Sequence, residues 1–286
     1  MPQVIDNPRE LFAATEALRG RGQRVGLVPT MGALHDGHMS LVAAARAAGA
    51  GPVVVSIFVN PLQFGKNEDL AKYPRTFADD LARCDKHGVD LIYAPSPDAM
   101  YPAGFQTHVE VEQVTQPFEG ASRPTHFRGV TTVVAKLFNA TGPCVAAFGR
   151  KDYQQWRTIE RMVRDLDIPV EVLGCPIARD EDGLAMSSRN RYLTASERTR
   201  APAIFLGLRA ASRAFARGER NRALLEQLAF DLIGAAFDNI DYATLADADE
   251  LTDPGAIAGE ASVMLVAARI GATRLIDNCR LGQDCL

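Results

Sequence analysis

The sequence RVGLVPTMGALHDGHMSLVAAARAAGAGPVVVSIFV, residues 24–59, sets the fold class of this chain. It begins with a short apolar run at 24–29, continues with an alanine-rich segment at 38–48 that is typical of a helix, and ends with a β-branched run at 53–59. Strands buried on both faces appear as continuous apolar runs, and a helix between two of them lets the strands lie parallel. The stretch therefore predicts a strand–helix–strand unit of a parallel sheet.

The same alternation continues through the first 177 residues. The expected helices lie at 77–87, 129–139 and 153–166, and the expected strands lie at 89–94, 145–148 and 170–175. Strands that alternate with helices favour an α/β fold, here a Rossmann-like parallel sheet with helices on both faces. Ligands of such sheets bind beyond the carboxyl ends of the strands, so polar clusters that follow strands are the candidate sites.

The character of the sequence changes after Pro176. A charged loop at 179–183 is followed by two helical stretches, 196–217 and 222–237, and by two strand-like runs, 263–268 and 274–277. We therefore expect a smaller C-terminal α+β domain, with domain 1–177 followed by domain 178–286.

The composition is that of a globular protein and argues against several classes of function. Of the 286 residues, 47% are hydrophobic and 23% are charged, and the net charge of −4 argues against a broad surface for nucleic acid or anionic membranes. Glycine, proline and asparagine interrupt the uncharged segment 47–65, so it is not expected to span a membrane. The five cysteines are scattered without a C-x-x-C pair, which indicates neither a disulfide framework nor a zinc ribbon. Because the residues before Leu11 lack an apolar core, we expect no signal peptide and a cytoplasmic enzyme.

The first polar cluster, TMGALHDGH at 30–38, lies between the first expected strand and its helix. Gly32 and Gly37 let the backbone approach a ligand, and a helix start presents unpaired N–H groups that suit a phosphate. His35 and His38 are three residues apart, so in a helical turn they share a face and can both donate to one polyphosphate. Two surface histidines in a turn, or a metal site, would explain the same H-x-x-H spacing. The chain has neither the P-loop motif nor the G-x-G-x-x-G fingerprint, so this loop is the candidate nucleotide site.

Neutral amides follow two of the expected strands. Asn60 and Gln63 belong to FVNPLQF at 58–64, and Gln155 ends FGRKDYQQ at 148–155. Amides both donate and accept hydrogen bonds, which suits the hydroxyls and carboxylate of a small polar substrate. An Asn-Pro turn with an incidental glutamine would explain the first of these motifs as well.

Cations and hydroxyls make up the remaining clusters. Gly149 allows close approach and Lys151 offers a charge to phosphate, while Asp152 also fits a helix N-cap. The segment MSSRNR at 186–191 has the composition of a phosphate clamp, or of serines that cap a helix in a charged linker. The segment RPTHFRG at 123–129 is basic and ends in glycine, so it could meet an anion or close over a site, but taken alone it is expected to be a solvated loop.

Together these motifs resemble the pantoate–β-alanine ligase (pantothenate synthetase) family. The resemblance rests on PTMGALHDGH, FVNPLQFG, YPRT, RPTHFRGV, FGRKDYQQ and DGLAMSSRNRYL, which begin at Pro29, Phe58, Tyr73, Arg123, Phe148 and Asp182. It covers residues 25–193 in order, and RLIDN at 274–278 extends it to the tail. It implies a nucleotidyltransferase-like α/β fold, a homodimer, and ATP-dependent ligation of (R)-pantoate and β-alanine to (R)-pantothenate through a pantoyl adenylate, with release of AMP and pyrophosphate. It also implies Mg²⁺ bound with the ATP.

The resemblance further implies roles for individual residues. The ATP phosphates would be bound by the loop of Met31, Gly32, Ala33, Leu34, His35, Asp36, Gly37 and His38, with His38 catalytic. Pantoate would be bound by Gln63 and Gln155, with Asn60 steadying the pocket. The nucleotide would also contact Gly149, Arg150, Lys151 (phosphate), Asp152 (ribose), Ala178 (adenine, through its backbone) and a C-terminal clamp of Met186, Ser187, Ser188 and Arg189. The charge that develops during the reaction would be stabilised by His35, His38, Lys151, Ser187, Ser188 and Arg189. Domain 1–177 would then bind the nucleotide and pantoate, and domain 178–286 would act as a lid.

Two positions depart from the family pattern. Arg150 stands where a glutamate is frequent, and Cys144 stands where an aspartate is common, which we interpret as a loop variation. A bound polyphosphate is expected to hold His38 protonated. Asp79 and Asp80 are interpreted as exposed helix carboxylates rather than outer contacts of Mg²⁺.

Two other functions fit some of the same motifs. A related nucleotidyltransferase would move AMP onto a phosphate substrate, although the neutral amides favour a ligand with a carboxylate and hydroxyls. A non-catalytic nucleotide sensor would use the same fold, although every expected catalytic position is present here.

Overall fold

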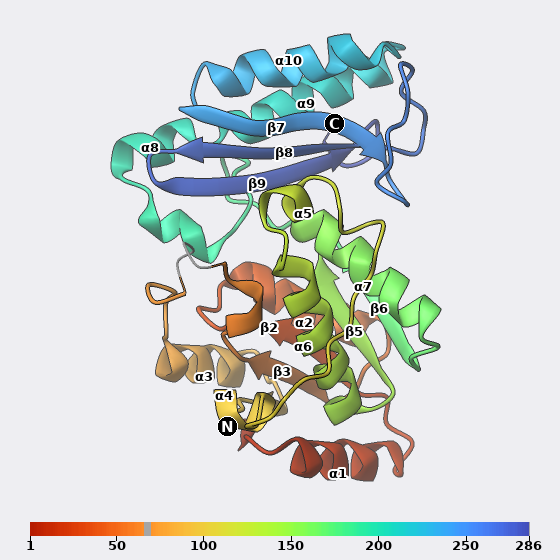
Figure 1. Ribbon diagram of the computed structural model, residues 1–286. Coiled ribbons are helices and arrows are strands. Elements are labelled where there is room, and N and C mark those ends of the chain that lie inside the picture. Colours follow the sequence, from red (N-terminus) through yellow and green to blue (C-terminus); the bar gives the residue numbers. More distant parts are fainter. Residues whose placement is uncertain (66–69, 286) are drawn as a thin grey trace. The chain divides into compact units, whose positions relative to one another are not determined.

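The computed structural model describes residues 1–65 and 70–285 (Figure 1). The chain divides into two compact units: Met1–Arg150 with Gln154–Pro176, and Lys151–Tyr153 with Ile177–Leu286. The division expected from the sequence lies after residue 177, with Lys151–Tyr153 in the first domain. The structure divides after Pro176 and groups Lys151–Tyr153 with the second unit.

The first unit is built on a six-stranded parallel sheet with the strand order β1-β4-β3-β2-β5-β6. Its strands are β1 (Gln3–Ile5), β2 (Gly26–Thr30), β3 (Val53–Ile57), β4 (Leu91–Tyr93), β5 (Cys144–Gly149) and β6 (Val170–Cys175). Val53, Val54 and Val55 of β3 are fully buried, as expected of a strand that is covered on both faces. The predicted α/β class is confirmed. The edge strand β1 has only three residues, too few to show a strand pattern in the sequence, and it is not among the expected strands.

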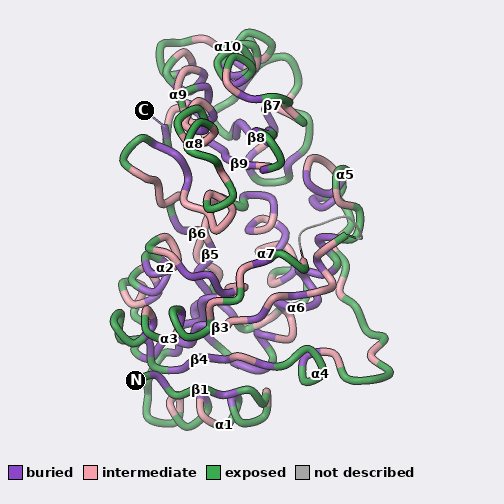
Figure 2. The backbone as a smooth tube through the Cα atoms, turned by 90° about the vertical axis from the view of Figure 1, so that its left-hand side faces the viewer, coloured by how far each residue is buried: buried purple, intermediate pink, exposed green. Residues whose placement is uncertain are grey.

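Helices cover both faces of this sheet. They are α1 (Pro8–Arg19), α2 (Asp36–Ala47), α3 (Phe77–Lys86), α4 (Pro97–Met100), α5 (Glu119–Ser122), α6 (His126–Thr141) and α7 (Tyr153–Asp165), with the single turns η1 (Pro61–Gln63) and η2 (Arg150–Asp152). Figure 2 shows α2 and α3 on one side of the strands and α6 on the other. Met39, Val42 and Ala45 recur every three residues along α2 and belong to one core cluster with Val28 and Val55 of the sheet.

Local signals explain where the helices begin. α2 begins two residues and α6 three residues before the expected positions. Helix α1 is not among the expected helices, although its start carries clear signals. Asn7 caps it by accepting hydrogen bonds from the N–H groups of Arg9 and Glu10, and Pro8 occupies its first turn. No helix within residues 1–65 and 70–285 has both the length and the apolar character needed to cross a bilayer.

The second unit packs helices on a three-stranded antiparallel sheet in the order β7-β8-β9. Its elements are η3 (Ser188–Tyr192), α8 (Ala195–Arg200), α9 (Ala203–Ala216), α10 (Arg222–Gly234), β7 (Asn239–Asp247), β8 (Ser262–Ile270) and β9 (Thr273–Arg280). Leu208 of α9, Leu225 of α10 and Val266 of β8 are buried in one core. The predicted α+β character is confirmed, but the helix expected at 196–217 is two helices. Pro202, which has no backbone N–H to donate, lies where they separate.

Candidate active site

The polar loops identified in the sequence follow three neighbouring strands of the first unit. β2 lies between β3 and β5, and all three strands are parallel (Figure 1). Their carboxyl ends, at Thr30, Ile57 and Gly149, therefore lie along one edge of the sheet. This edge is where ligands of parallel sheets bind, and it forms the candidate active site of the first unit.

The loop after β2, which we call the histidine loop (residues 31–38), has an unusual backbone. Gly32 and Ala33 have φ angles of 81° and 51°, so two consecutive residues adopt the left-handed conformation. Alanine adopts this conformation only at some cost in free energy, so contacts from outside the loop are needed to hold it. Gly32 also has little room for a side chain, because a Cβ there would lie 3.0 Å from Asp80 Oδ2.

Asp80 of α3 supplies the contact that holds this backbone. Its Oδ2 accepts a hydrogen bond from the Ala33 N–H at 3.0 Å, and its Oδ1 accepts one from the Leu34 N–H at 2.7 Å. The Thr76 hydroxyl donates to the same carboxylate at 3.2 Å. Asp80 is only 2% exposed, so the expectation of an exposed helix carboxylate is wrong for this residue. A buried carboxylate requires such donors, and here they come from the histidine loop.

The two histidines contact each other at the start of α2. His35 is the N-cap residue, His38 lies in the first turn, and their ring centroids are 4.0 Å apart. The His35 N–H donates to His38 Nδ1 at 3.2 Å. Because Nδ1 accepts this bond, the proton of the neutral imidazole lies on Nε2, where it can be donated to a ligand. The expectation that a bound polyphosphate holds His38 protonated stays a prediction.

A second contact joins α3 to the histidine loop. Arg83 Nη1 donates to Asp36 Oδ1 at 2.5 Å. The Asp36 side chain is 74% exposed, so this pair adds little to stability. The Asp36 side chain is thus bonded to α3, whereas His35 and His38 contact each other.

Asn60 and Gln63 form a buried amide pair around η1. Asn60 is 1% exposed, and its Nδ2 donates to Gln63 Oε1 and to the Gly129 carbonyl, both at 3.0 Å. Its Oδ1 accepts from the Tyr101 hydroxyl at 2.8 Å, so the amide is used within the protein. With Oε1 held by Asn60, the Gln63 Nε2 donates to Met31 Sδ at 3.2 Å. The amide pair therefore adjoins the histidine loop, and Asn60 orients Gln63.

Three residues that support this amide pair were missed in the sequence. Burial raises the pKa of Tyr101, so its hydroxyl keeps the proton that it donates to Asn60. His126 Nδ1 lies 2.9 Å from the Gln63 carbonyl, and Arg123 donates to the same oxygen at 3.2 Å. His126 is 8% exposed, so the expectation of a solvated loop at 123–129 is wrong. Arg123 and His126 of this motif instead contact the backbone carbonyl of Gln63 and hold it in place.

Gly129 explains why the start of α6 can lie so close to η1. A Cβ at this position would lie 2.3 Å from the Leu62 carbonyl oxygen, so only glycine lets α6 pack against η1. The Gly129 carbonyl also accepts from Asn60. The motif that resembles the family at 123–130 is thus explained by packing beneath the amide pair.

The two adjacent glutamines of α7 differ in their surroundings. Gln154 is 4% exposed; its Nε2 donates to the carbonyls of Val114 and Pro117, and its Oε1 accepts from the Glu119 N–H. These bonds make Gln154 a structural residue. Gln155 is only half-buried and remains the candidate for a ligand contact.

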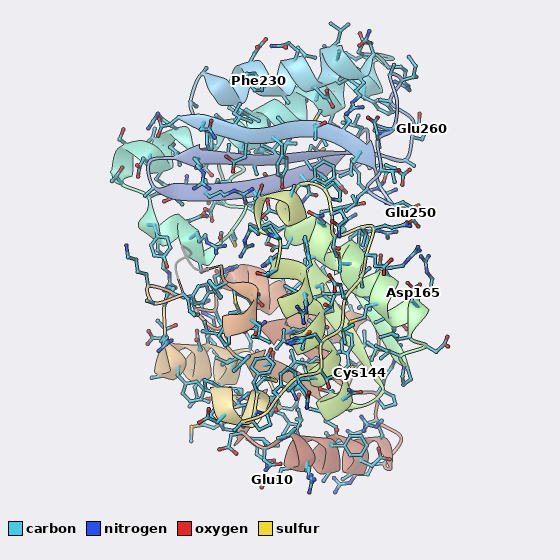
Figure 3. The ribbon with its side chains drawn as sticks, in the orientation of Figure 1. Glu10, Cys144, Asp165, Phe230, Glu250 and Glu260 are labelled. Atoms are coloured by element: carbon cyan, nitrogen blue, oxygen red, sulfur yellow. The ribbon has the colours of Figure 1, made fainter. Side chains whose placement is uncertain are left out.

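The two departures from the family pattern lie at opposite ends of β5. Cys144 is the first residue of the strand and is buried, and Figure 3 shows it at the amino end. It is a sheet position, so the interpretation as a loop variation is wrong. Burial raises the pKa of its thiol to about 12, which makes it an unreactive core residue. Arg150 follows Gly149 at the carboxyl end and begins η2.

The remaining candidate residues belong to the second unit. Lys151 Nζ lies 3.7 Å from Asp152 Oδ2. The Ala178 carbonyl accepts from the Met186 N–H at 2.9 Å, and Arg179 pairs with Ala185 in an antiparallel bridge. Ala178 and Met186 are therefore brought together across a short hairpin, residues 178–186.

Ser187 follows this hairpin and is the N-cap residue of η3. Its Oγ accepts from the Arg189 N–H at 3.3 Å, so it caps η3. The capping interpretation of this serine therefore has a geometric basis. A ligand role for Ser187, Ser188 and Arg189, all half-buried, stays a prediction.

Comparisons with known proteins show which family and which solved structures this chain is similar to. The family model described as Pantoate-beta-alanine ligase matches residues 3–280. The chain is 50% identical to the pantothenate synthetase of Geobacter sulfurreducens, with 99% of each chain covered, and 49% identical to that of Chloroherpeton thalassium, with 98% and 99% covered. A solved pantothenate synthetase from Thermus thermophilus matches with a TM-score of 0.92, 44% identity, and 98% and 99% coverage. A pantoate-β-alanine ligase from Francisella tularensis, solved with beta-gamma ATP and β-alanine, matches with a TM-score of 0.79, 32% identity and 98% coverage of both chains.

Proposed function

The chain belongs to the pantoate–β-alanine ligase family, and we infer from this membership that it joins (R)-pantoate to β-alanine, with ATP as the second substrate, to form (R)-pantothenate. The observation within this chain that supports the inference best is the contact between Gln63 Nε2 and Met31 Sδ. It brings a neutral amide pair, suited to a hydroxy acid, next to a loop suited to phosphates. A carboxylate and ATP bound at these two places would be neighbours.

The first step is attack of a pantoate carboxylate oxygen on the α-phosphorus of ATP. A bond forms between that oxygen and the α-phosphorus. The bond between the α-phosphorus and the oxygen that bridges it to the β-phosphorus breaks, and pyrophosphate leaves with that electron pair. The product is pantoyl adenylate. The protein forms no covalent bond, so positioning and stabilisation of charge supply the rate enhancement.

The histidine loop is proposed to bind the phosphates in this step. The Nε2–H of His38 donates to a phosphate oxygen, together with His35 and the backbone N–H groups at the start of α2. His38 can act as a neutral donor because the His35 N–H fixes its tautomer. Asp80 holds the loop in place before ATP arrives, which is the arrangement that stabilises developing charge most effectively.

The second step is attack of the neutral β-alanine amine on the acyl carbonyl of the adenylate. The amide bond forms, the bond between the carbonyl carbon and the bridging oxygen breaks, AMP leaves with that oxygen, and the amine loses a proton. The adenylate also reacts with water, so excluding water raises the yield of pantothenate.

We assign pantoate to Gln63 and Gln155, and we assign Asn60 the indirect role of orienting Gln63. Asn60 has its amide fully used by protein partners, which supports this division. Pantoate offers a carboxylate and hydroxyls, and amides of fixed orientation can bind both.

The second unit is proposed to supply further ATP contacts and to shield the adenylate as a lid. Lys151 would bind phosphate, Asp152 the ribose and the Ala178 backbone the adenine. Met186, Ser187, Ser188 and Arg189 would form the clamp, and Gly149 and Arg150 at the end of β5 would adjoin the nucleotide. The family resemblance supports these assignments, and the cationic and hydroxyl side chains suit a polyphosphate.

Mg²⁺ is proposed to bind together with ATP. Within the described residues, no group of three or more histidine, cysteine, aspartate or glutamate side chains converges on one point. The proposed ligands of the ion are chiefly phosphate oxygens and water, as is usual for Mg²⁺ bound with a nucleotide. The oxygens of Asp80 already accept three hydrogen bonds, so only the exposed Asp79 is suited to an outer contact. The family resemblance also supports a homodimer in the cytoplasm.

An AMP-release assay tests the proposed function. The enzyme is incubated with ATP and pantoate, with and without β-alanine, and pyrophosphate, AMP and pantothenate are quantified. We expect catalytic AMP release only when β-alanine is present, with pantothenate formed in equal amount. Multiple turnovers to a stable adenylated product without any amine would instead indicate a nucleotidyltransferase. ATP binding without turnover would indicate a sensor.

A further inference from the structure

We propose that Asp277 and Asn278, adjacent residues of β9, are positioning residues that hold two separate ATP-binding segments of the second unit as one set. The segments are Lys151–Asp152 and the hairpin 178–186 that leads into the clamp. This inference rests on the proposed function, because it assigns ATP contacts to both segments. It gives a role to the RLIDN motif at 274–278, which the proposed function leaves without one.

Asn278 holds the Lys151–Asp152 segment. Its Nδ2 donates to the Lys151 carbonyl oxygen at 2.9 Å, across 127 positions of sequence, and the residue is 2% exposed. The segment has a second anchor in the same unit, since the Tyr153 hydroxyl donates to the Ala248 carbonyl at 3.0 Å. These bonds agree with the grouping of Lys151–Tyr153 with the second unit.

Asp277 holds the hairpin. Its carboxylate binds Arg179 in a bidentate pair, with Arg179 Nη1 to Oδ2 at 2.6 Å and Nη2 to Oδ1 at 3.0 Å. The Asp277 side chain is fully buried. The Arg179 guanidinium also lies over the Phe205 ring, at 4.3 Å from its centroid, and donates to the Gly183 carbonyl. Bidentate pairs fix both distance and orientation, so Arg179 is held more tightly than a single bond would allow.

Bonds within the hairpin connect Arg179 to the proposed ATP contacts on either side of it. Arg179 pairs with Ala185 in the antiparallel bridge, and Ala178 accepts from the Met186 N–H. The Asn190 side chain donates to the Ala185 carbonyl at 3.1 Å, which ties η3 to the hairpin. Fixing Arg179 therefore fixes the backbone of Ala178 on one strand and the start of the clamp on the other.

The alternation of side chains along a strand explains why two adjacent residues can do this. Successive residues of a strand face opposite sides of the sheet. Leu275 and Cys279, on the same side as Asp277, are buried in the core with α9 and α10. Asn278 faces the other side, where it reaches Lys151. Asp277 thus binds the hairpin on one face of β9, and Asn278 binds the Lys151–Asp152 segment on the other face. The strand sets the distance between these two segments.

Amide hydrogen exchange tests the structural half of the proposal on the full chain without ligands. Asn278→Ala is expected to speed exchange in peptides covering 150–153 and to leave 178–187 protected. Asp277→Asn is expected to do the reverse. Leu275→Ala, which removes a buried side chain from the same strand, serves as the control for general loosening of the unit. Equal loosening of both segments in both variants, or of neither, would overturn the proposal.

Steady-state kinetics test whether this positioning serves ATP. Asn278→Ala is expected to raise the KM for ATP about tenfold, the upper range for one neutral hydrogen bond, with the KM for pantoate within about twofold. In a Lys151→Ala background the same substitution is expected to have a smaller effect on the KM for ATP, because the ammonium group that Asn278 positions through the Lys151 backbone is already absent. Equal effects in both backgrounds would contradict positioning through Lys151.

Two further experiments distinguish a variant that does not fold, and a wrong role for Lys151, from failure of the proposal itself. If Asn278→Ala does not fold, Asn278→Asp keeps the volume of the side chain, removes the donor, and is expected to give the same exchange pattern. If Lys151→Ala alone leaves the KM for ATP unchanged, the proposed role of Lys151 fails. The exchange pattern then still decides whether Asp277 and Asn278 hold the two segments.

Discussion

The histidine loop of the first unit and the clamp residues Ser187 and Arg189 of the second carry similar proposed tasks but are held in different ways. The histidine loop is fixed by a buried side chain from another helix, because Asp80 binds the N–H groups of Ala33 and Leu34. Ser187, in contrast, bonds to the backbone of Arg189 two residues away. The histidine loop is thus bonded directly by a buried carboxylate of another helix, whereas Ser187 makes a local cap just beyond the hairpin 178–186 that Asp277 anchors.

This difference bears on how each region can act. A loop with a fixed backbone can present its donors before ATP arrives, which suits stabilisation of charge in the reaction. The half-buried Ser187 is capped through a bond that spans two residues, and we expect such a local cap to adjust at a lower cost in free energy than the backbone that Asp80 holds. The contrast predicts that substitutions in and under the histidine loop affect the chemical step or stability strongly, and that substitutions in the clamp affect ATP binding weakly.

The largest expected effect on activity comes from His38→Ala. Removing the proposed donor should lower the rate of adenylate formation by about 10²–10³-fold, with little change in stability. Single-turnover quench experiments with ATP and pantoate measure this rate. His87→Ala, at an exposed histidine after α3, is the matched control and should leave the rate unchanged. Near-normal adenylate formation by His38→Ala would remove His38 from the mechanism.

The next effect separates Asp80 from its neighbour. Asp80→Asn places an NH₂ group against backbone N–H donors, so we expect about 3 kcal/mol lower stability and adenylate formation slowed at least about tenfold. Urea unfolding and single-turnover kinetics measure the two changes. Asp79→Asn, at the adjacent exposed carboxylate, should alter stability by no more than about 0.5 kcal/mol. Similar results for the two variants would contradict the role of Asp80 as the support of the loop.

A smaller effect is expected beneath the amide pair. Tyr101→Phe removes the hydrogen bond to Asn60 Oδ1, which loosens the orientation of Gln63. We expect the KM for pantoate to rise about three- to tenfold, with the KM for ATP unchanged. Initial-rate measurements with each substrate varied in turn check this. A rise in both constants would show that Tyr101 supports the fold generally and does not act through Gln63.

The smallest effect should come from the clamp. Ser187→Ala removes the cap of η3, so we expect a loss of about 1 kcal/mol or less and a rise of a few-fold in the KM for ATP. Thermal unfolding and initial rates measure both. A loss of stability as large as that of Asp80→Asn would mean that the clamp is as firmly built in as the histidine loop, and the contrast between the two regions would fail.

The fold was predictable from the sequence because burial leaves a local pattern. The continuous apolar runs of β2 and β3 and the alternating helices indicate a parallel sheet, and the carboxyl ends of its strands indicate where ligands bind. Strand β7 was not predictable from its sequence, because it has Asn239 and Asp241 near its start and a register shift between Ile240 and Tyr242. Polar residues and an irregular register hide the period of two.

The supports of the site were not predictable in this way. Asp79 and Asp80 are identical in type and adjacent, and only the packing of α3 buries one and exposes the other. Tyr101 and His126 act on a motif that lies tens of residues earlier in the chain. Periodicity describes neighbours along the chain, whereas these contacts depend on which elements meet in space. Loop residues are thus identifiable as ligand-binding candidates, while the residues that hold the loops are identifiable only in the fold.

The central claim is that the pantoate carboxylate itself attacks the α-phosphorus of ATP. Pantoate with both carboxylate oxygens labelled with oxygen-18 tests this directly, in a reaction with ATP and β-alanine followed by mass spectrometry of the AMP. We expect each AMP to carry a single labelled oxygen, because the bridging oxygen of the adenylate leaves with AMP when the amine attacks the carbonyl. The pantothenate amide should retain the other labelled oxygen. AMP without label would contradict an adenylate intermediate.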